Sequence, residues 1–273
     1  MKRTIMEYKV PFTNGRPYGI TVGAAGDIWF TDYAGNRIAR MTAAGHVDAW
    51  PVPTKDAGVM SILSDHQGEI WFTAYQANQI GRMTCSGTFD LYELPTANSS
   101  PYGITEGPDG EIWFTELTGG RIGKINREGE ITEYALPDSD CYPSYIAAGP
   151  DDALWFTENQ ANRIGRMTVD GQYAAYEIPT PRSGPVGITR GPDEAMWFVE
   201  IMGNHIGRIT TAGEINEYAI PTSNARPHAI ACGIDGELWF TEWGGNQIGC
   251  ITTEGEFAEY PISTPNAEPH GIL

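Results

Sequence analysis

Two histidines occupy the same position in consecutive copies of a repeated sequence. His228 lies eleven residues before Trp239, and His270 follows one repeat of 42 residues later. Two residues before each histidine stands a charged residue, Arg226 in one copy and Glu268 in the other. A neutral imidazole can abstract a proton, and carboxylate oxygens can hold a hard cation that stabilises the resulting anion. These residue types indicate metal-assisted proton abstraction, although polar residues without a catalytic role fit the same pattern.

The other copies of this position hold aromatic, apolar or small residues. In chain order they are Tyr18, Met60, Tyr102, Ser144 and Val186. Function is expected where the repeat stops being repetitive, because ligands usually bind where inner strands of a propeller end. The remaining histidines lie in turns or at the start of a strand, and we expect them to be solvated: His46, His66 and His205.

A repeat that runs through the chain sets these positions. Six copies of a Trp-Phe pair begin at residues 29, 71, 113, 155, 197 and 239, so each lies 42 residues after the last. Repeats of roughly 40–45 residues are typical of four-stranded propeller blades. In the copy that begins at Pro101, short runs of alternating apolar residues are separated by turns rich in Gly and Asp. We therefore predict an all-β propeller of four-stranded antiparallel blades, as a single domain over residues 1–273.

The two ends of the chain predict an incomplete seventh blade. Residues 6–11 match the fourth strands at 132–137 and 216–221, and residues 269–273 match a first strand. We therefore predict a seven-bladed β-propeller whose seventh blade has an N-terminal outer strand and a C-terminal inner strand but lacks its centre. This arrangement is expected of a fragment of a longer protein. A six-bladed ring with two leftover strands is the alternative.

The composition argues against several classes of partner. Lys and Arg number 17 against 35 for Asp and Glu, which gives a formal net charge of −18. A chain this acidic is repelled by the phosphates of nucleic acid. No apolar run approaches the length that spans a membrane, and the N-terminal residues do not follow the pattern of a signal peptide. We expect a cytoplasmic monomer that binds neither nucleic acid nor membranes.

Four segments carry motifs of a known family. They read Pro-Tyr-Gly-Ile-Thr-Glu-Gly-Pro-Asp-Gly at 101–110, Gly-Pro-Val-Gly-Ile-Thr at 184–189, Ala-Arg-Pro-His-Ala-Ile at 225–230 and Ala-Glu-Pro-His-Gly-Ile at 267–272. With these motifs the sequence resembles the virginiamycin B lyase (streptogramin B lyase) family from Glu7 to Leu273. The resemblance implies a seven-bladed propeller that linearises streptogramin B antibiotics, which are cyclic depsipeptides, by elimination. A base removes the α-proton of the threonine that closes the ring, and the ester carboxylate then leaves.

The resemblance also implies a role for individual residues. His270 would be the general base, His228 a substrate-binding residue and Glu268 a ligand of Mg²⁺. Three aromatic residues would form walls for the substrate: Tyr18, Tyr102 and Trp243. The family's second magnesium-binding glutamate would fall in the missing part of the seventh blade, so we expect much-reduced turnover.

The resemblance thus implies a carbon–oxygen lyase that confers antibiotic resistance. Two alternative functions of other classes remain open. One is a non-catalytic propeller that binds a peptide or a protein, which has no need of the cluster of His and Glu residues. The other is a metal-dependent hydrolase or lactonase on the same fold. Hydrolysis adds one water to a cyclic substrate, whereas elimination leaves its mass unchanged.

Overall fold

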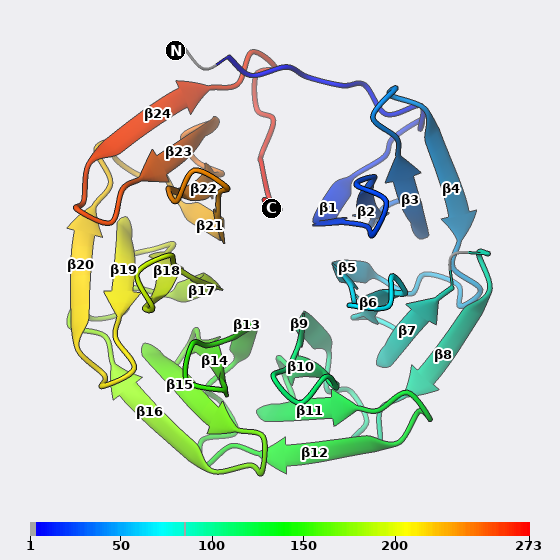
Figure 1. Cartoon of the computed structure of the whole chain (residues 1–273), viewed down its shortest axis with the longest axis horizontal. Coiled ribbons are helices and arrows are strands. Elements are labelled where there is room, and N and C mark those ends of the chain that lie inside the picture. Colours follow the sequence, from blue (N-terminus) through cyan, green and yellow to red (C-terminus); the bar gives the residue numbers. More distant parts are fainter. Residues whose placement is uncertain (1–3, 85) are drawn as a thin grey trace. The chain divides into compact units, whose positions relative to one another are not determined.

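The computed structural model describes residues 4–84 and 86–273, and every regular element in these residues is a β-strand. They separate into two compact units. The N-terminal unit comprises residues 8–143, and the C-terminal unit comprises residues 144–273 with the segment that ends at Glu7. Each unit contains three four-stranded antiparallel sheets, and neighbouring strands in a sheet are consecutive in the chain (Figure 1). These sheets are propeller blades, so the predicted all-β propeller fold is confirmed.

The N-terminal unit holds the first three sheets. Their strands are β1 (Pro17–Val22), β2 (Ile28–Asp32), β3 (Arg37–Met41), β4 (Val47–Pro51), β5 (Val59–Ser64), β6 (Ile70–Ala74), β7 (Gln79–Met83), β8 (Phe89–Glu93), β9 (Pro101–Glu106), β10 (Ile112–Glu116), β11 (Arg121–Ile125) and β12 (Ile131–Ala135).

The C-terminal unit holds the fourth, fifth and sixth sheets. Their strands are β13 (Pro143–Ala148), β14 (Ala153–Glu158), β15 (Arg163–Thr168), β16 (Tyr173–Glu177), β17 (Pro185–Arg190), β18 (Met196–Glu200), β19 (His205–Ile209), β20 (Ile215–Ala219), β21 (Pro227–Cys232), β22 (Leu238–Glu242), β23 (Gln247–Ile251) and β24 (Phe257–Pro261). No described segment forms a helix long and apolar enough to cross a membrane.

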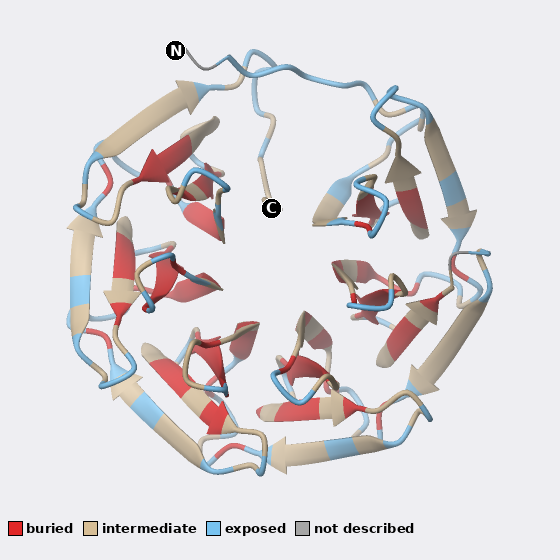
Figure 2. Ribbon diagram, in the orientation of Figure 1, coloured by how far each residue is buried: buried red, intermediate tan, exposed pale blue. Residues whose placement is uncertain are grey.

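The second strand of each sheet is the most deeply buried, and the first and third strands add further core residues (Figure 2). In β6, Trp71 and Phe72 are both fully buried. The indole of Trp71 stacks on Tyr92 of the fourth strand, with ring centroids 6.2 Å apart. Phe72 covers Gly81 of the third strand so closely that a Cβ at Gly81 would lie 2.1 Å from the phenyl ring. The Trp-Phe, Gly and Tyr positions pack together in this way in the other sheets except the first, which has Ala39 in place of the glycine and Trp50 in place of the tyrosine.

A β-bulge shapes the first strand of the sixth sheet. Pro227 pairs with Glu242 and Ile230 pairs with Phe240, so the register shifts between these two pairs. Two residues, His228 and Ala229, lie in the shifted stretch. Because a bulge changes the direction in which side chains point, this irregularity sets the orientation of His228.

The predicted seventh blade is wrong for the described residues, which contain six sheets of four strands. Residues 4–10 and 269–273 form no strand. An outer and an inner strand of a blade pair with the two middle strands, and neither terminal segment has such partners. Glu7 nevertheless accepts a hydrogen bond from the Thr264 amide at 2.9 Å, as Glu259 of β24 accepts one from the Thr222 amide at 3.1 Å. The N-terminal segment therefore keeps the side-chain contact of a fourth strand without its backbone pairing. The prediction of a single domain stays a prediction.

Candidate functional site

Three of the predicted site residues pack together in the C-terminal unit. The rings of His228 and His270 are perpendicular, with centroids 4.9 Å apart. Trp243 lies against both, at 5.5 Å from the His270 ring and 6.5 Å from the His228 ring. Tyr145 of β13 makes a perpendicular contact with His228 at 5.9 Å. Two imidazoles and two aromatic rings therefore form one cluster, which we call the histidine cluster.

The sixth sheet positions the two histidines relative to each other. Thr241 of β22 is fully buried, and its hydroxyl accepts a hydrogen bond from the Ala229 amide at 3.0 Å. The same hydroxyl donates to the carbonyl oxygen of His270, also at 3.0 Å. Thr241 thus links the bulged strand that carries His228 to the backbone of His270.

Asn246 fixes the segment that leads to His270. Its side-chain NH₂ donates to the carbonyl oxygens of Ile262 and Thr264 at 3.2 and 3.1 Å, and its side-chain oxygen accepts from the Ala267 amide at 2.6 Å. Asn246 itself has a left-handed φ of 54°, a conformation that asparagine tolerates better than most residues. The segment therefore has a defined course although it forms no strand.

Burial keeps one of the histidines neutral. The His228 side chain is 6% exposed. Loss of solvent, and then the charge of neighbouring His270, lower the pKa of His228 to about 4. At neutral pH this imidazole is therefore uncharged and can act as a hydrogen-bonding group, but it cannot supply a positive charge.

Glu268 precedes His270 by two residues and is exposed. Its φ of 47° is left-handed, which is unusual for a glutamate and turns the backbone just before His270. One exposed carboxylate can hold a Mg²⁺ ion that takes its other ligands from water or from a substrate. Glu268 fits such an open site, and its role as a ligand stays a proposal.

Two predicted wall residues meet in the N-terminal unit. The hydroxyls of Tyr18 and Tyr102 are 2.5 Å apart and share a hydrogen bond. Tyr75 packs on the edge of Tyr102, with ring centroids 6.3 Å apart. The structure therefore brings Tyr18 and Tyr102 together, and their binding of a substrate stays a prediction.

The predictions for the remaining histidines are only partly right. His46 and His66 are exposed as predicted, with 72% and 56% of their side chains accessible to solvent, although His66 also binds Glu106 through its backbone amide and its ring. His205 lies beside the fully buried Glu200 and is 24% exposed. Together with Glu217, these last two form a group of side chains that could hold a metal ion.

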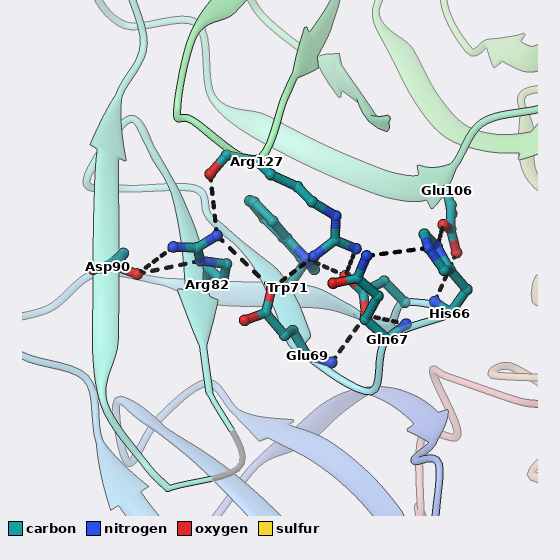
Figure 3. A network of polar contacts seen from close by, with 9 residues as sticks. His66, Gln67, Glu69, Trp71, Arg82, Asp90, Glu106 and Arg127 are labelled. Atoms are coloured by element: carbon teal, nitrogen blue, oxygen red, sulfur yellow. Dashed lines mark hydrogen bonds and ion pairs between the residues drawn. The ribbon is translucent and has the colours of Figure 1, made fainter. Parts of the chain in front are cut away.

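His66 belongs to a polar network on the turns of the N-terminal unit (Figure 3). Arg127 reaches from the third sheet to the second, where it donates to Asp65 at 2.7 Å and to Glu69 at 3.0 Å. Asp65 also accepts from the indole of buried Trp71 at 3.1 Å. Because these partners are turn and core residues that hold two sheets together, we interpret the network as structural.

Comparison with known proteins decides the family. The family model described as the virginiamycin B lyase family matches residues 3–273. The chain belongs to the virginiamycin B lyase family. The predicted resemblance is thus confirmed, and so, at the level of the family, is the prediction of a lyase.

Solved structures of lyases are close to this chain in fold and sequence. A virginiamycin B lyase from Staphylococcus aureus is 56% identical, with a TM-score of 0.92 over 94% of this chain and 88% of that chain. A catalytically inactive variant of the Staphylococcus aureus lyase, in which one histidine is replaced by alanine, was solved with quinupristin. It is 53% identical, with a TM-score of 0.96 over 98% of this chain and 92% of that chain.

A curated relative matches over a shorter stretch. The virginiamycin B lyase of Bacillus licheniformis is 52% identical over 47 residues, which are 17% of this chain and 16% of that protein. This match is therefore local, and it adds to the family assignment without describing the remaining blades.

Sequence reasoning missed three members of the sites described above. Thr241 belongs to the repeated Trp-Phe-Thr motif, and Thr31 and Thr157 make equivalent hydrogen bonds in their own sheets, so the repeat gave no signal that Thr241 contacts His270. Tyr145 and Glu217 lie in strands β13 and β20, and only the fold brings them to His228 and His205.

Proposed function

We propose that this member of the virginiamycin B lyase family linearises streptogramin B-type cyclic depsipeptides by elimination and thereby inactivates them. The observation that carries the proposal is the packing of His228, Trp243 and His270 into one cluster. Family membership supports it, and so does the relative that loses catalysis when one histidine becomes alanine and that was solved with quinupristin.

His270 acts as the general base. It removes the α-proton of the threonine whose side-chain oxygen closes the ring, and the electron pair forms a Cα–Cβ double bond as the Cβ–O bond breaks. The carboxylate leaves, and the linear product ends in dehydrobutyrine. Because no water is added, the mass does not change. The Thr241 hydroxyl holds the backbone of the base through the His270 carbonyl oxygen at 3.0 Å.

His228 and Trp243 bind the substrate next to this base. A neutral imidazole, as burial imposes on His228, can hydrogen-bond a peptide group without protonating it. The indole of Trp243 offers an apolar face to an aromatic macrocycle. Trp243 also packs on the His270 ring, so a bound substrate that rests on the indole lies next to the base.

Mg²⁺ is the cofactor that we propose, with Glu268 as its protein ligand. When bound, the ion supplies positive charge that lowers the cost of forming the anion next to the substrate carbonyl. The exposure of Glu268, two residues before His270, supports this assignment. The expectations of a monomer and of a cytoplasmic location stay predictions.

Turnover of quinupristin by the full chain tests the proposal. General-base catalysis contributes roughly 10²–10⁴-fold, so His270→Ala should lower kcat/KM by that factor. His46→Ala is the matched control, because it removes an exposed histidine with its own acidic neighbour, Asp48, and should leave turnover unchanged. If His270→Ala is as active as His46→Ala, His270 is not the base.

The metal assignment has a separate test. After treatment with EDTA, the wild-type chain should lose turnover and regain it on addition of Mg²⁺. Glu268→Gln should need a higher Mg²⁺ concentration for half-maximal turnover. An identical Mg²⁺ dependence in the wild type and in Glu268→Gln would remove Glu268 from the proposal and leave the base assignment in place.

A further inference from the structure

A second group of ligating side chains lies in the fifth sheet, apart from the histidine cluster. Glu200 ends β18, and it pairs across a tight turn with His205, which begins β19. Glu217 is the third residue of the neighbouring strand β20. Ligand atoms of the three side chains all lie within 4.8 Å of one another, and His205 Nδ1 is 3.6 Å from Glu200 Oε2.

Glu200 is fully buried, and its charge is not compensated by hydrogen bonds. Among the described residues, neither of its carboxylate oxygens has a hydrogen-bond partner. A buried carboxylate without a donor or a cation is costly, so this geometry calls for a positively charged partner.

The fourth sheet shows one way in which this place is filled. There Glu158 is equally buried, and Arg163 donates to its Oε2 from Nε at 2.9 Å and from Nη2 at 2.7 Å. The hydroxyl of Tyr173 donates to Oε1 at 2.5 Å. In the first sheet Arg37 pairs with Asp32 in the same way at 2.9 Å. The fourth and first sheets thus carry a fixed cation next to the buried acid.

The fifth sheet replaces this cation by a ligand. His205 stands where the fourth sheet has Arg163, and Glu217 stands where the fourth sheet has Ala175. The substitutions exchange a guanidinium for an imidazole and add a second carboxylate. One Glu217 oxygen, Oε1, accepts from the Thr180 amide at 3.0 Å, which fixes this side chain in position.

The donor set identifies the class of ion. One imidazole nitrogen with carboxylate oxygens is a ligand set of Zn²⁺ and related first-row transition metals, while Mg²⁺ and Ca²⁺ prefer oxygen alone. Two ligands of a tetrahedral Zn²⁺ ion are roughly 3.3 Å apart when each metal–ligand distance is roughly 2.0–2.1 Å. The 3.6 Å between His205 Nδ1 and Glu200 Oε2 needs little adjustment to reach that spacing.

We propose that Glu200, His205 and Glu217 bind a divalent transition-metal ion, with Zn²⁺ as the representative. The ion ties the turn at residues 201–204 to β20 and neutralises the buried Glu200, as Arg163 neutralises Glu158 in the fourth sheet. The site is structural and shares no residue with the histidine cluster, so it does not depend on the proposed lyase reaction.

Zn²⁺ and Co²⁺ binding to the EDTA-treated full chain tests this proposal. Calorimetric titration should show one tightly bound Zn²⁺ ion per chain in the wild type. The affinity for this ion should fall at least about 100-fold in His205→Arg, which copies the fourth sheet. Co²⁺ should give a visible absorption band in the wild type that is absent from this variant. His205→Gln, which copies Gln247 of the sixth sheet, is the second variant in case the arginine alters folding.

His46→Ala is the control for exposed histidines, and it should still bind one Zn²⁺ ion tightly and show the Co²⁺ absorption band. Thermal unfolding gives an independent measure, because an ion that binds the native state raises the melting temperature. Zn²⁺ should raise it for the wild type and for His46→Ala but for neither His205 variant. The proposal is overturned if the wild type and both His205 variants bind Zn²⁺ with the same stoichiometry and affinity.

Discussion

Replacing Thr241 by valine separates the positioning of His270 from the stability of the blade. Valine has nearly the shape of threonine but has no hydroxyl, so Thr241→Val removes the bonds to the Ala229 amide and to the His270 carbonyl oxygen, each 3.0 Å long. Val199 occupies the equivalent position in the fifth sheet and is fully buried there, which shows that the blade accepts valine.

The structure gives the size of the effect on stability. Each lost hydrogen bond costs about 0.5–1.5 kcal/mol, and a buried amide without a partner costs about 1–3 kcal/mol. The free energy of unfolding of Thr241→Val should therefore fall by about 2–4 kcal/mol. Thr157→Val is the matched control, because Thr157 makes the same two bonds, with the Tyr145 amide at 3.2 Å and with the Val186 carbonyl oxygen at 2.6 Å.

The two variants should differ in catalysis. A displacement of about 1 Å in a catalytic group can cost on the order of 10²-fold in rate, and of these two threonines Thr241 is the one that bonds the backbone of the proposed base. We expect kcat on quinupristin to fall roughly 10- to 100-fold in Thr241→Val and less than about threefold in Thr157→Val. Thr241→Ser, which restores the hydroxyl, should recover most of the loss.

Denaturant unfolding measures the stability of the three variants, and steady-state kinetics measures their turnover. Equal kcat values for Thr241→Val and Thr157→Val at equal loss of stability would refute the positioning role of Thr241. Failure of Thr241→Ser to recover turnover would point to a defect in packing rather than to the lost hydroxyl.

Four further predictions concern stability, pH and metal binding. Burial is the main cause that raises the pKa of Glu116 to about 7 from an ordinary 4.5. Protonated Glu116 thus stabilises the native state below about pH 4.5, and this stabilisation is lost as the pH rises through about 7. In urea unfolding, the free energy of unfolding of Glu116→Gln relative to the wild type should therefore rise by up to about 3 kcal/mol between about pH 5 and about pH 8. Gly81→Ala should lose about 1–3 kcal/mol in the same assay, because its Cβ would meet the Phe72 ring at 2.1 Å. Since the pKa of His228 is lowered to about 4, kcat/KM of His228→Asn should keep the wild-type pH profile between about pH 5 and about pH 8, and a shifted limb would show that His228 titrates there. Gln247→His should add a second Zn²⁺ equivalent by calorimetry, since it places an imidazole beside Glu242 and near Glu259 in the sixth sheet.

The blades could be predicted from the sequence because their determinants are local. Trp71 and Phe72 recur at fixed spacing and pack in the core. Gly81 recurs in every sheet but the first, where Ala39 takes its place, and it leaves room for the phenyl ring. The prediction of a seventh blade was wrong for a physical reason. Matching residues 6–11 and 269–273 to strands identified their sequence pattern, but a strand exists only where a neighbour completes its ladder.

The candidate site was predictable where the repeat itself varies. His228 and His270 stand out because their position holds other residue types in the other copies, and the structure places the two rings in contact. His205 was misjudged as solvated, because nothing local to its turn shows that Glu217 joins it from another strand. Contacts between side chains of neighbouring strands depend on register and on side-chain direction, which the period of the repeat alone does not give.

The measurement that tests the central claim most directly is the mass of the product formed from quinupristin by the full chain. Elimination predicts a linear product with the mass of the intact antibiotic and a dehydrobutyrine end, formed by the wild type and not by His270→Ala. A product heavier by one water would show hydrolysis and contradict the lyase mechanism. Intact quinupristin, recovered with Mg²⁺ present, would contradict the proposed activity altogether.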